Sequence, residues 1–151
     1  MERRELSRRT IAICLAGGIL HAIFALWLSE LVRGRSFWGT NMPETLSGVA
    51  LLSVTILGLV LLGSVPLVLF FRYRLLSPLL ALLVCFTWAF YTSYQHFEEA
   101  RATGATPLGL DADSLFGILW FIPLAIVLLV GLIEYLVRSR FDSRPFGTAF
   151  D

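Results

Sequence analysis

The sequence contains no lysine, only two cysteines and only two histidines. Its twelve basic residues are all arginine, and the formal net charge is +1. Nucleic-acid binding requires a concentrated basic face, which a nearly neutral chain lacks, so we expect no nucleic-acid partner. Cys14 and Cys85 are far apart and form no C-x-x-C pair, so we interpret them as small buried residues rather than a redox or zinc site. The sequence therefore predicts no cofactor and no resident metal.

Charge is also absent from four long stretches, each of at least 20 residues without Asp, Glu, Lys or Arg. About 20 apolar residues are enough for a helix to cross the ~30 Å hydrocarbon core of a bilayer. None of the four alternates polar and apolar residues as a barrel strand does. The sequence predicts an all-α integral membrane protein: one membrane domain over residues 1–151, folded as an antiparallel four-helix transmembrane bundle. The predicted spans are approximately 10–30, 46–70, 77–97 and 114–137.

The distribution of the arginines predicts how the bundle is oriented. Nine of the twelve lie in the N-terminal tail, in the link between the second and third spans, and in the C-terminal tail. Only Arg33, Arg35 and Arg101 lie on the opposite side. By the positive-inside rule, we expect both termini to be cytoplasmic, N-in/C-in, in a multi-pass protein of the cell membrane. The first uncharged run exceeds the roughly 7–15 residues of a signal-peptide core, so we expect a retained anchor.

Local signals predict where several spans begin and bend. Ser77 followed by Pro78 is typical of an N-cap with proline at the first helical position. Asn41 and Asp113 are the candidate caps of the second and fourth spans. Pro123 removes one backbone hydrogen bond from the fourth span and predicts a kink there.

Small residues at four-residue spacing predict where the helices pack, because lipid tails are as apolar as leucine and close backbone approach drives association. Rows of this kind run along the first and third spans. We therefore expect these two spans to form the tight centre of the bundle, with the second span more exposed to lipid. The alternative is that the small residues line a pore. The candidate packing residues are Gly17, Gly18, Ala22, Ala81, Cys85 and Ala89.

His21 is the ionisable residue nearest the middle of a span, where such a side chain is costly and usually faces inward. Thr87 at similar depth on the third span is a candidate hydrogen-bond partner, with Tyr91 one turn further out. One interpretation is a neutral histidine that bridges two helices. The other is a proton-relay or substrate-binding group.

The remaining candidates lie near the ends of the spans. His96, Glu99, Asp111 and Asp113 are interpreted either as a solvated acidic outer loop or as an external divalent-metal site. The pairs Glu30 with Arg33 and Glu134 with Arg138 are most simply interfacial ion pairs. A carboxylate that couples transport to protons is expected nearer mid-membrane than Glu30 or Glu134.

No catalytic, cofactor or transport motif stands out, and the sequence predicts a protein that is not an enzyme. The leading interpretation is a non-catalytic scaffold or accessory subunit of a membrane complex. Its partners are then the lipid bilayer and either further copies of itself or a larger membrane protein. The alternative is a small ion or proton translocator that uses His21 at mid-membrane. An intramembrane enzyme is the weakest hypothesis, because its metal would have to come from the outer loop.

Overall fold

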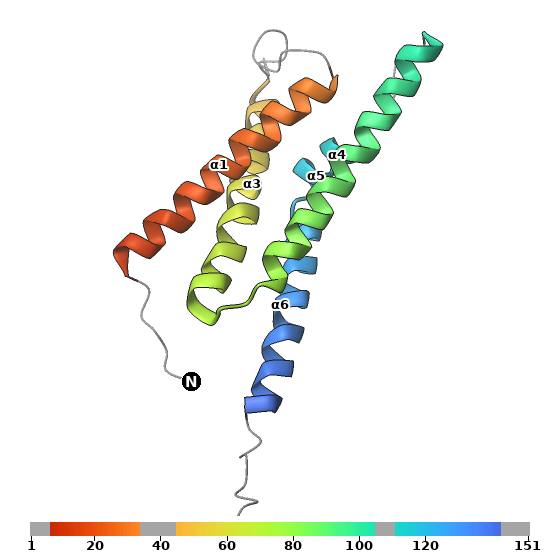
Figure 1. Ribbon diagram of the computed structural model, residues 1–151. Helices are drawn as coiled ribbons and strands as arrows, with labels where there is room; N and C mark the ends of the chain where they lie inside the picture. Colours follow the sequence, from red (N-terminus) through yellow and green to blue (C-terminus); the bar gives the residue numbers. More distant parts are fainter. Residues whose placement is uncertain (1–6, 34–44, 105–110, 143–151) are drawn as a thin grey trace, which may run out of the picture.

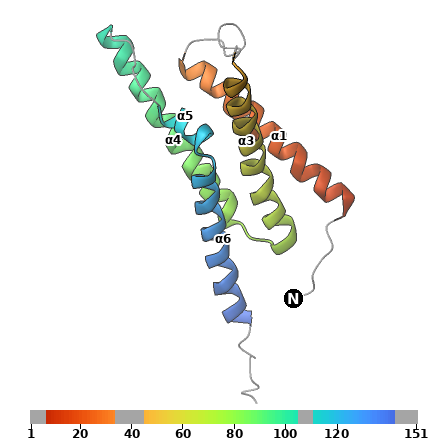
Figure 2. The same ribbon diagram turned by 180° about the vertical axis from the view of Figure 1, so that it is seen from behind.

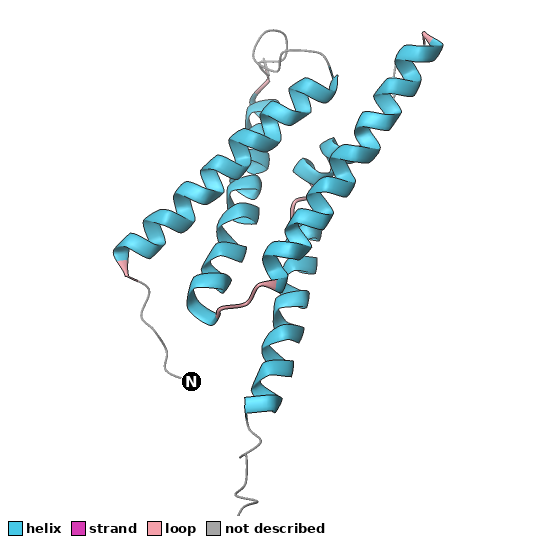
Figure 3. Ribbon diagram, in the orientation of Figure 1, coloured by secondary structure: helices cyan, strands magenta, loops and turns pink. Residues whose placement is uncertain are grey.

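The computed structural model describes residues 7–33, 45–104 and 111–142, and all regular secondary structure in these residues is α-helical (Figure 3). Four of the described helices are long and apolar enough to cross a membrane, as predicted for a multi-pass membrane protein. A fifth is short. The helices are α1 (Arg8–Arg33), α3 (Leu46–Tyr73), α4 (Ser77–Thr103), α5 (Ala112–Ile118) and α6 (Phe121–Asp142).

The long helices form two pairs, in which α1 packs on α3 and α4 packs on α6. Successive long helices run in opposite directions along the vertical axis of Figure 1, and the lower half of α1 diverges from the rest. The short helix α5 lies beside α4 in both this view and the view from behind (Figure 2). It lies near the end of α1 and beside the second half of α4.

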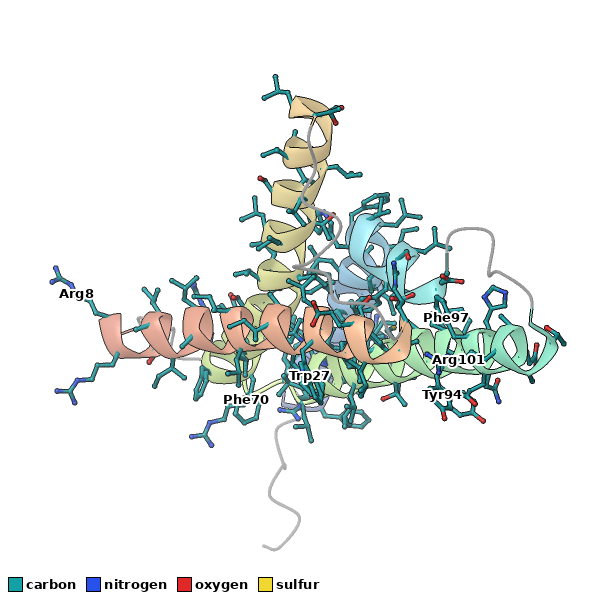
Figure 4. The ribbon with its side chains drawn as sticks, turned by 90° about the horizontal axis from the view of Figure 1, so that it is seen from above. Arg8, Trp27, Phe70, Tyr94, Phe97 and Arg101 are labelled. Carbon is teal, nitrogen blue, oxygen red and sulfur yellow. The ribbon has the colours of Figure 1, made fainter. Side chains whose placement is uncertain are left out.

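Large apolar side chains cover the outside of the helices, as expected when lipid rather than water surrounds them (Figure 4). The core is small and contains an aromatic cluster from α4 and α5. Within it, Phe86 contacts Phe90 with ring centroids 4.5 Å apart and Phe116 at 5.7 Å. Leu62 of α3 and Val127 of α6 are fully buried beside this cluster.

The closest backbone approach is between α1 and α3, which are the first and second predicted spans. This corrects the prediction that the first and third spans, α1 and α4, form the tight centre. A Cβ atom on Gly18 would collide with Ser64 Oγ and with the carbonyl oxygen of Val60, and one on Gly63 would lie 2.6 Å from His21 Cβ. Glycines on both helices therefore allow this contact. The prediction missed it because it considered small residues at four-residue spacing, and Gly63 of α3 belongs to no such row.

The other candidate packing residues also lie inside the molecule. Ala22 and Ala89 are buried, while Ala81 and Cys85 are partly buried against the aromatic core. Gly17 faces the flexible end of the Leu67 side chain. The small-residue row of α4 thus contacts the chain's own helices.

The predicted fourth span is interrupted between α5 and α6, at Leu119 and Trp120. Pro123 has no N–H to donate to the carbonyl of Leu119, four residues earlier. That carbonyl instead accepts from Ile122 N at 2.9 Å, a tighter turn than an α-helix makes. The predicted kink is therefore a break, and the ring of Trp120 packs against Gly58 of α3 beside it.

The helix starts also differ in detail from the prediction. Leu76, not Ser77, is the N-cap of α4, and Pro78 lies in its first turn. Thr45 caps α3 by accepting from Gly48 N, whereas the predicted cap Asn41 lies outside the described residues. The N-cap of α5 is Asp111, two residues before the predicted Asp113.

Candidate functional site

Asp113 is the buried carboxylate at the end of the molecule where α1, α4 and α5 meet. Its Oδ2 accepts from Ser29 Oγ at 2.6 Å and from Arg33 Nη2 at 2.8 Å and Nε at 3.2 Å. Its Oδ1 accepts from Ser93 Oγ at 3.0 Å. Arg33 Nη2 also donates to Ser114 Oγ. We call these five residues, from three helices, the outer polar cluster, after the side that the sequence predicts for this end.

The local fold explains why a carboxylate is stable at this place. Asp113 lies in the first turn of α5, where unpaired backbone N–H groups favour a negative charge. Its own N–H donates to Ser93 Oγ at 2.8 Å. The Asp113 side chain is 0% exposed, while that of Arg33 is 36% exposed, so the ion pair extends from the interior to the surface. A buried charge of this kind is tolerated when it is both paired and hydrogen-bonded.

This position corrects two interpretations of Asp113, as a helix cap and as part of a solvated acidic loop. It also shows that Arg33 pairs with Asp113, 80 residues away in sequence. A sequence signal for the cluster exists: Ser29 and Arg33 are four residues apart and share one face of α1. Nothing in the sequence indicated that Ser93 and Asp113 would meet that face.

The other charged or titratable side chains near this end are more exposed than that of Asp113. His96 Nδ1 lies 2.8 Å from Asp111 Oδ1, and Glu98 pairs with Arg101 at 2.8 Å. Arg101 also donates to the carbonyl of Val32 at 3.0 Å, which joins α4 to the end of α1. Within residues 7–33, 45–104 and 111–142, no three His, Cys, Asp or Glu side chains are grouped as metal ligands. Asp113 is committed to Arg33 and the serines rather than to His96.

At the opposite end, Glu134 of α6 contacts the start of α4. Its Oε2 accepts from Ser77 N at 2.8 Å, and its Oε1 accepts from Leu76 N at 3.4 Å. The predicted ion pair with Arg138 is present, with Nη2 2.5 Å from Oε1. Arg138 Nη1 also donates to the carbonyl of Arg74, 2.9 Å away, at the end of α3. We call these five residues the inner polar cluster, after the side that the sequence predicts for this end; the cluster joins the α3–α4 link to α6.

Between the two clusters, His21 lies in the contact between α1 and α3, near α4. Its ring centroid is 5.3 Å from that of Phe86, and its Nε2 is buried without a hydrogen-bond partner among the described residues. The predicted hydrogen bond to Thr87 is not formed, because Thr87 lies on the exposed face of α4. Tyr91 is on that exposed side too and accepts from Gln95 Nε2 at 2.8 Å. The three candidate polar residues are therefore not brought together.

A second orphan polar atom lies near His21. Ser64 Oγ of α3 is buried and, like His21 Nε2, has no partner among the described residues. Ser64 follows Gly63, which contacts His21, and Ser64 itself faces Gly18 on the same side of α1. Sequence reasoning overlooked Ser64 because a serine within an apolar run is unremarkable by itself.

In comparisons with known proteins, no family model, no curated protein and no solved structure matches the chain. The function is therefore inferred from the geometry of the chain's own residues. Asp113 and Glu134 hold helices together, whereas His21 and Ser64 lie between the two clusters.

Proposed function

We propose that this chain is a non-catalytic accessory subunit of a membrane complex. It crosses the cell membrane as an antiparallel four-helix bundle with both termini cytoplasmic, and it associates through the outward face of α4. The observation that carries this proposal is the position of Trp88. Trp88 is 66% exposed although it lies in the middle of a helix that is long and apolar enough to cross a membrane.

The depth of Trp88 is unusual for a tryptophan that faces lipid. It is eleven residues from the first residue of α4, or about 16 Å along the helix axis at ~1.5 Å per residue. This is near the middle of a ~30 Å hydrocarbon core. Tryptophan facing lipid prefers the membrane interfaces, where its ring is amphipathic and its N–H reaches water. A protein surface is a better neighbour for the Trp88 indole at this depth.

The residues around Trp88 form a continuous exposed face of α4. Leu80, Val84 and Tyr91 lie one to two turns away on the same side and are also exposed. Aromatic residues of this kind are enriched at protein interfaces. The small residues of α4 are already packed inside the chain, so the large apolar residues are what this helix offers to a partner.

The polar clusters support a non-catalytic role. Asp113 is surrounded by donors that hold α1 and α4, and Glu134 accepts the first N–H groups of α4. A general base or metal ligand must instead have a lone pair directed at a substrate or ion. Both carboxylates are therefore better suited to joining helices.

The proposal is tested by photo-crosslinking in native membranes with benzoyl-phenylalanine placed at position 88. The matched control carries the same group at position 27, because Trp27 is also exposed but lies toward the end of α1. We expect one reproducible product from position 88, either to a larger chain or to a second copy, and little from position 27. Equal lipid-only products at both positions would contradict an interface on α4.

A second candidate function, a small proton or ion translocator, is favoured by the two orphan atoms at mid-depth. His21 Nε2 and Ser64 Oγ are both buried near the contact of α1 and α3 and lack partners among the described residues. Groups of this kind are expensive in a bilayer and often mark an ion pathway. In this function, His21 binds and releases the proton, and Ser64 is a second polar group along the same path.

The translocator is tested by proton flux into liposomes that contain the purified protein. His21→Ala should abolish the flux, and Ser64→Ala should reduce it. Cys85→Ala is a control outside the α1–α3 contact. Full flux in the His21→Ala protein would eliminate this candidate.

A further inference from the structure

We propose that the ends of α3 and α6 near the inner polar cluster form a binding site for the headgroup of an anionic phospholipid. The end of α3 lies beside the C-terminal half of α6, which continues beyond it (Figure 1). Tyr73 of α3 and Tyr135 of α6 contact edge to face, with ring centroids 5.9 Å apart. Arg138 of α6 donates to the carbonyl of Arg74 just beyond α3.

Arginine side chains collect at this place. The guanidinium of Arg72 lies over the ring of Tyr73, 5.4 Å from its centroid, which orients it at the helix end. Arg74 is exposed, and its φ of 54° gives it the left-handed conformation that ends α3. Arg138 and Arg140 are exposed on the last turns of α6.

The local charge is positive and matches a phosphate group. The four arginines are accompanied in these helix ends by two acidic residues. One of the two, Glu134, is already engaged by backbone N–H groups and by Arg138. The guanidinium group is suited to phosphate oxygens because its N–H donors form a planar fork. The basic residues are Arg72, Arg74, Arg138 and Arg140, and the acidic residues are Glu134 and Asp142.

Apolar side chains beside the arginines favour a lipid over a free phosphate ion. Phe71 of α3, and Leu132 and Leu136 of α6, are large, exposed and within one or two turns of the arginines. They lie where acyl chains below a bound headgroup would run. Basic pockets between transmembrane helices are known to bind anionic headgroups in this way.

The chain contains a matched control in Arg8 and Arg9. They are exposed at the start of α1 and would face the same leaflet in the antiparallel bundle. That end of α1 lies apart from the ends of α3 and α6 in Figures 1 and 2, and Figure 4 shows Arg8 pointing away from the other helices. Removing this pair lowers the net charge as much as removing Arg72 and Arg74.

The experiment titrates the purified full chain in neutral detergent with dioleoyl phosphatidylglycerol or dioleoyl phosphatidylcholine. Bound lipid is counted by native mass spectrometry. We expect phosphatidylglycerol to bind at least about tenfold more tightly than phosphatidylcholine. The double variant Arg72→Gln with Arg74→Gln should lose roughly tenfold of that affinity, and Arg8→Gln with Arg9→Gln less than about twofold.

Three outcomes would overturn the site. They are equal binding of the two lipids, equal losses in the two double variants, and complete competition by millimolar inorganic phosphate, which would indicate a general anion site. The Arg74 substitution leaves its backbone carbonyl available to Arg138. If the double variant nevertheless fails to fold, by circular dichroism, Arg72→Gln alone must give a loss of at least about threefold.

Discussion

At the scale of single residues, Asp113 is joined to α1 and α4 by one ion pair and by hydrogen bonds from two serines. Asp113→Asn keeps the shape but removes the charge that Arg33 neutralises. Hydrogen bonds to charged groups contribute about 1.5–3 kcal/mol, and Arg33 is partly exposed. We therefore expect the free energy of unfolding to fall by about 1–3 kcal/mol, measured by titration from mild detergent into dodecyl sulfate.

The control for Asp113 is Glu98→Gln, which removes one member of the exposed pair with Arg101. Such pairs contribute about 0.5 kcal/mol or less. If both substitutions destabilise the protein equally, the outer polar cluster does not contribute to stability by joining α1, α4 and α5.

Gly18 and Gly17 provide a second comparison at this scale. A Cβ at Gly18 meets the backbone carbonyl of Val60, whereas one at Gly17 meets only the flexible end of Leu67. Gly18→Ala should force α1 and α3 apart and cost about 1–3 kcal/mol. Gly17→Ala should be nearly neutral, since alanine favours the helix by up to ~1 kcal/mol. Their unfolding curves should differ clearly, and identical curves would refute the close contact.

The sequence indicated which residues are small or charged, but not which of them meet. His21 lies on the inward side of α1 with a buried ring nitrogen, but Thr87, its predicted partner, faces outward, and Ser64 was overlooked. Asp113 has no local pattern that predicts burial, because its partners Ser29 and Ser93 are separated from it by 84 and 20 residues. Contacts of this kind depend on tertiary packing.

At the scale of helices, α4 begins against a side chain from another helix. Its N-cap Leu76 offers no side-chain acceptor, and Glu134 accepts from Leu76 N and Ser77 N instead. Capping interactions contribute about 1 kcal/mol. Glu134→Ala should cost about 1–2 kcal/mol and should also leave Arg138 without its carboxylate partner.

The measurement for Glu134 combines the unfolding titration with the rate of proteolysis in the α3–α4 link. Glu134→Gln retains an acceptor and should lie between Glu134→Ala and the unaltered protein. An unchanged rate of cleavage in Glu134→Ala would show that the link is held by other contacts.

The helices themselves were largely predictable, because uncharged apolar runs of this length rarely form anything other than a long helix. The break before α6 was predictable in part: Pro123 locates the lost hydrogen bond, but not the turn that replaces it. The start of α4 shows the same limit. Ser77 is a good cap by residue type, and the acceptor that the backbone uses comes from position 134.

At the scale of the whole molecule, the pairing of helices was the least predictable feature. Small residues at four-residue spacing predicted contact between the first and third spans, α1 and α4. The closest contact instead joins α1 to α3, the second span. The leucine-rich second span, α3, was expected to be more exposed to lipid. Its glycine Gly63 was a better indicator of where α3 packs, because it lies against α1. In a bilayer, a single glycine opposite a backbone can decide which pair of helices approaches most closely.

The proposed orientation predicts which positions are reached from outside the cell. In a protein with both cysteines replaced by alanine, single cysteines are placed at Ser7, Glu98 and Ser139. A membrane-impermeant maleimide should label only Glu98→Cys in intact cells, and all three after permeabilisation. Labelling of Ser7→Cys or Ser139→Cys in intact cells would contradict cytoplasmic termini.

The outer polar cluster also has a consequence for biogenesis. Ser29 and Arg33 leave the ribosome long before Asp113, which follows them by 84 and 80 residues in the sequence. Until Asp113 is synthesised, the donors on α1 (Ser29 and Arg33) and on α4 (Ser93) lack the carboxylate that accepts from all of them. Synthesis must therefore pass residue 113 before this end of the protein can close. A chain that stops before residue 113 leaves the donors of Ser29, Arg33 and Ser93 without this acceptor.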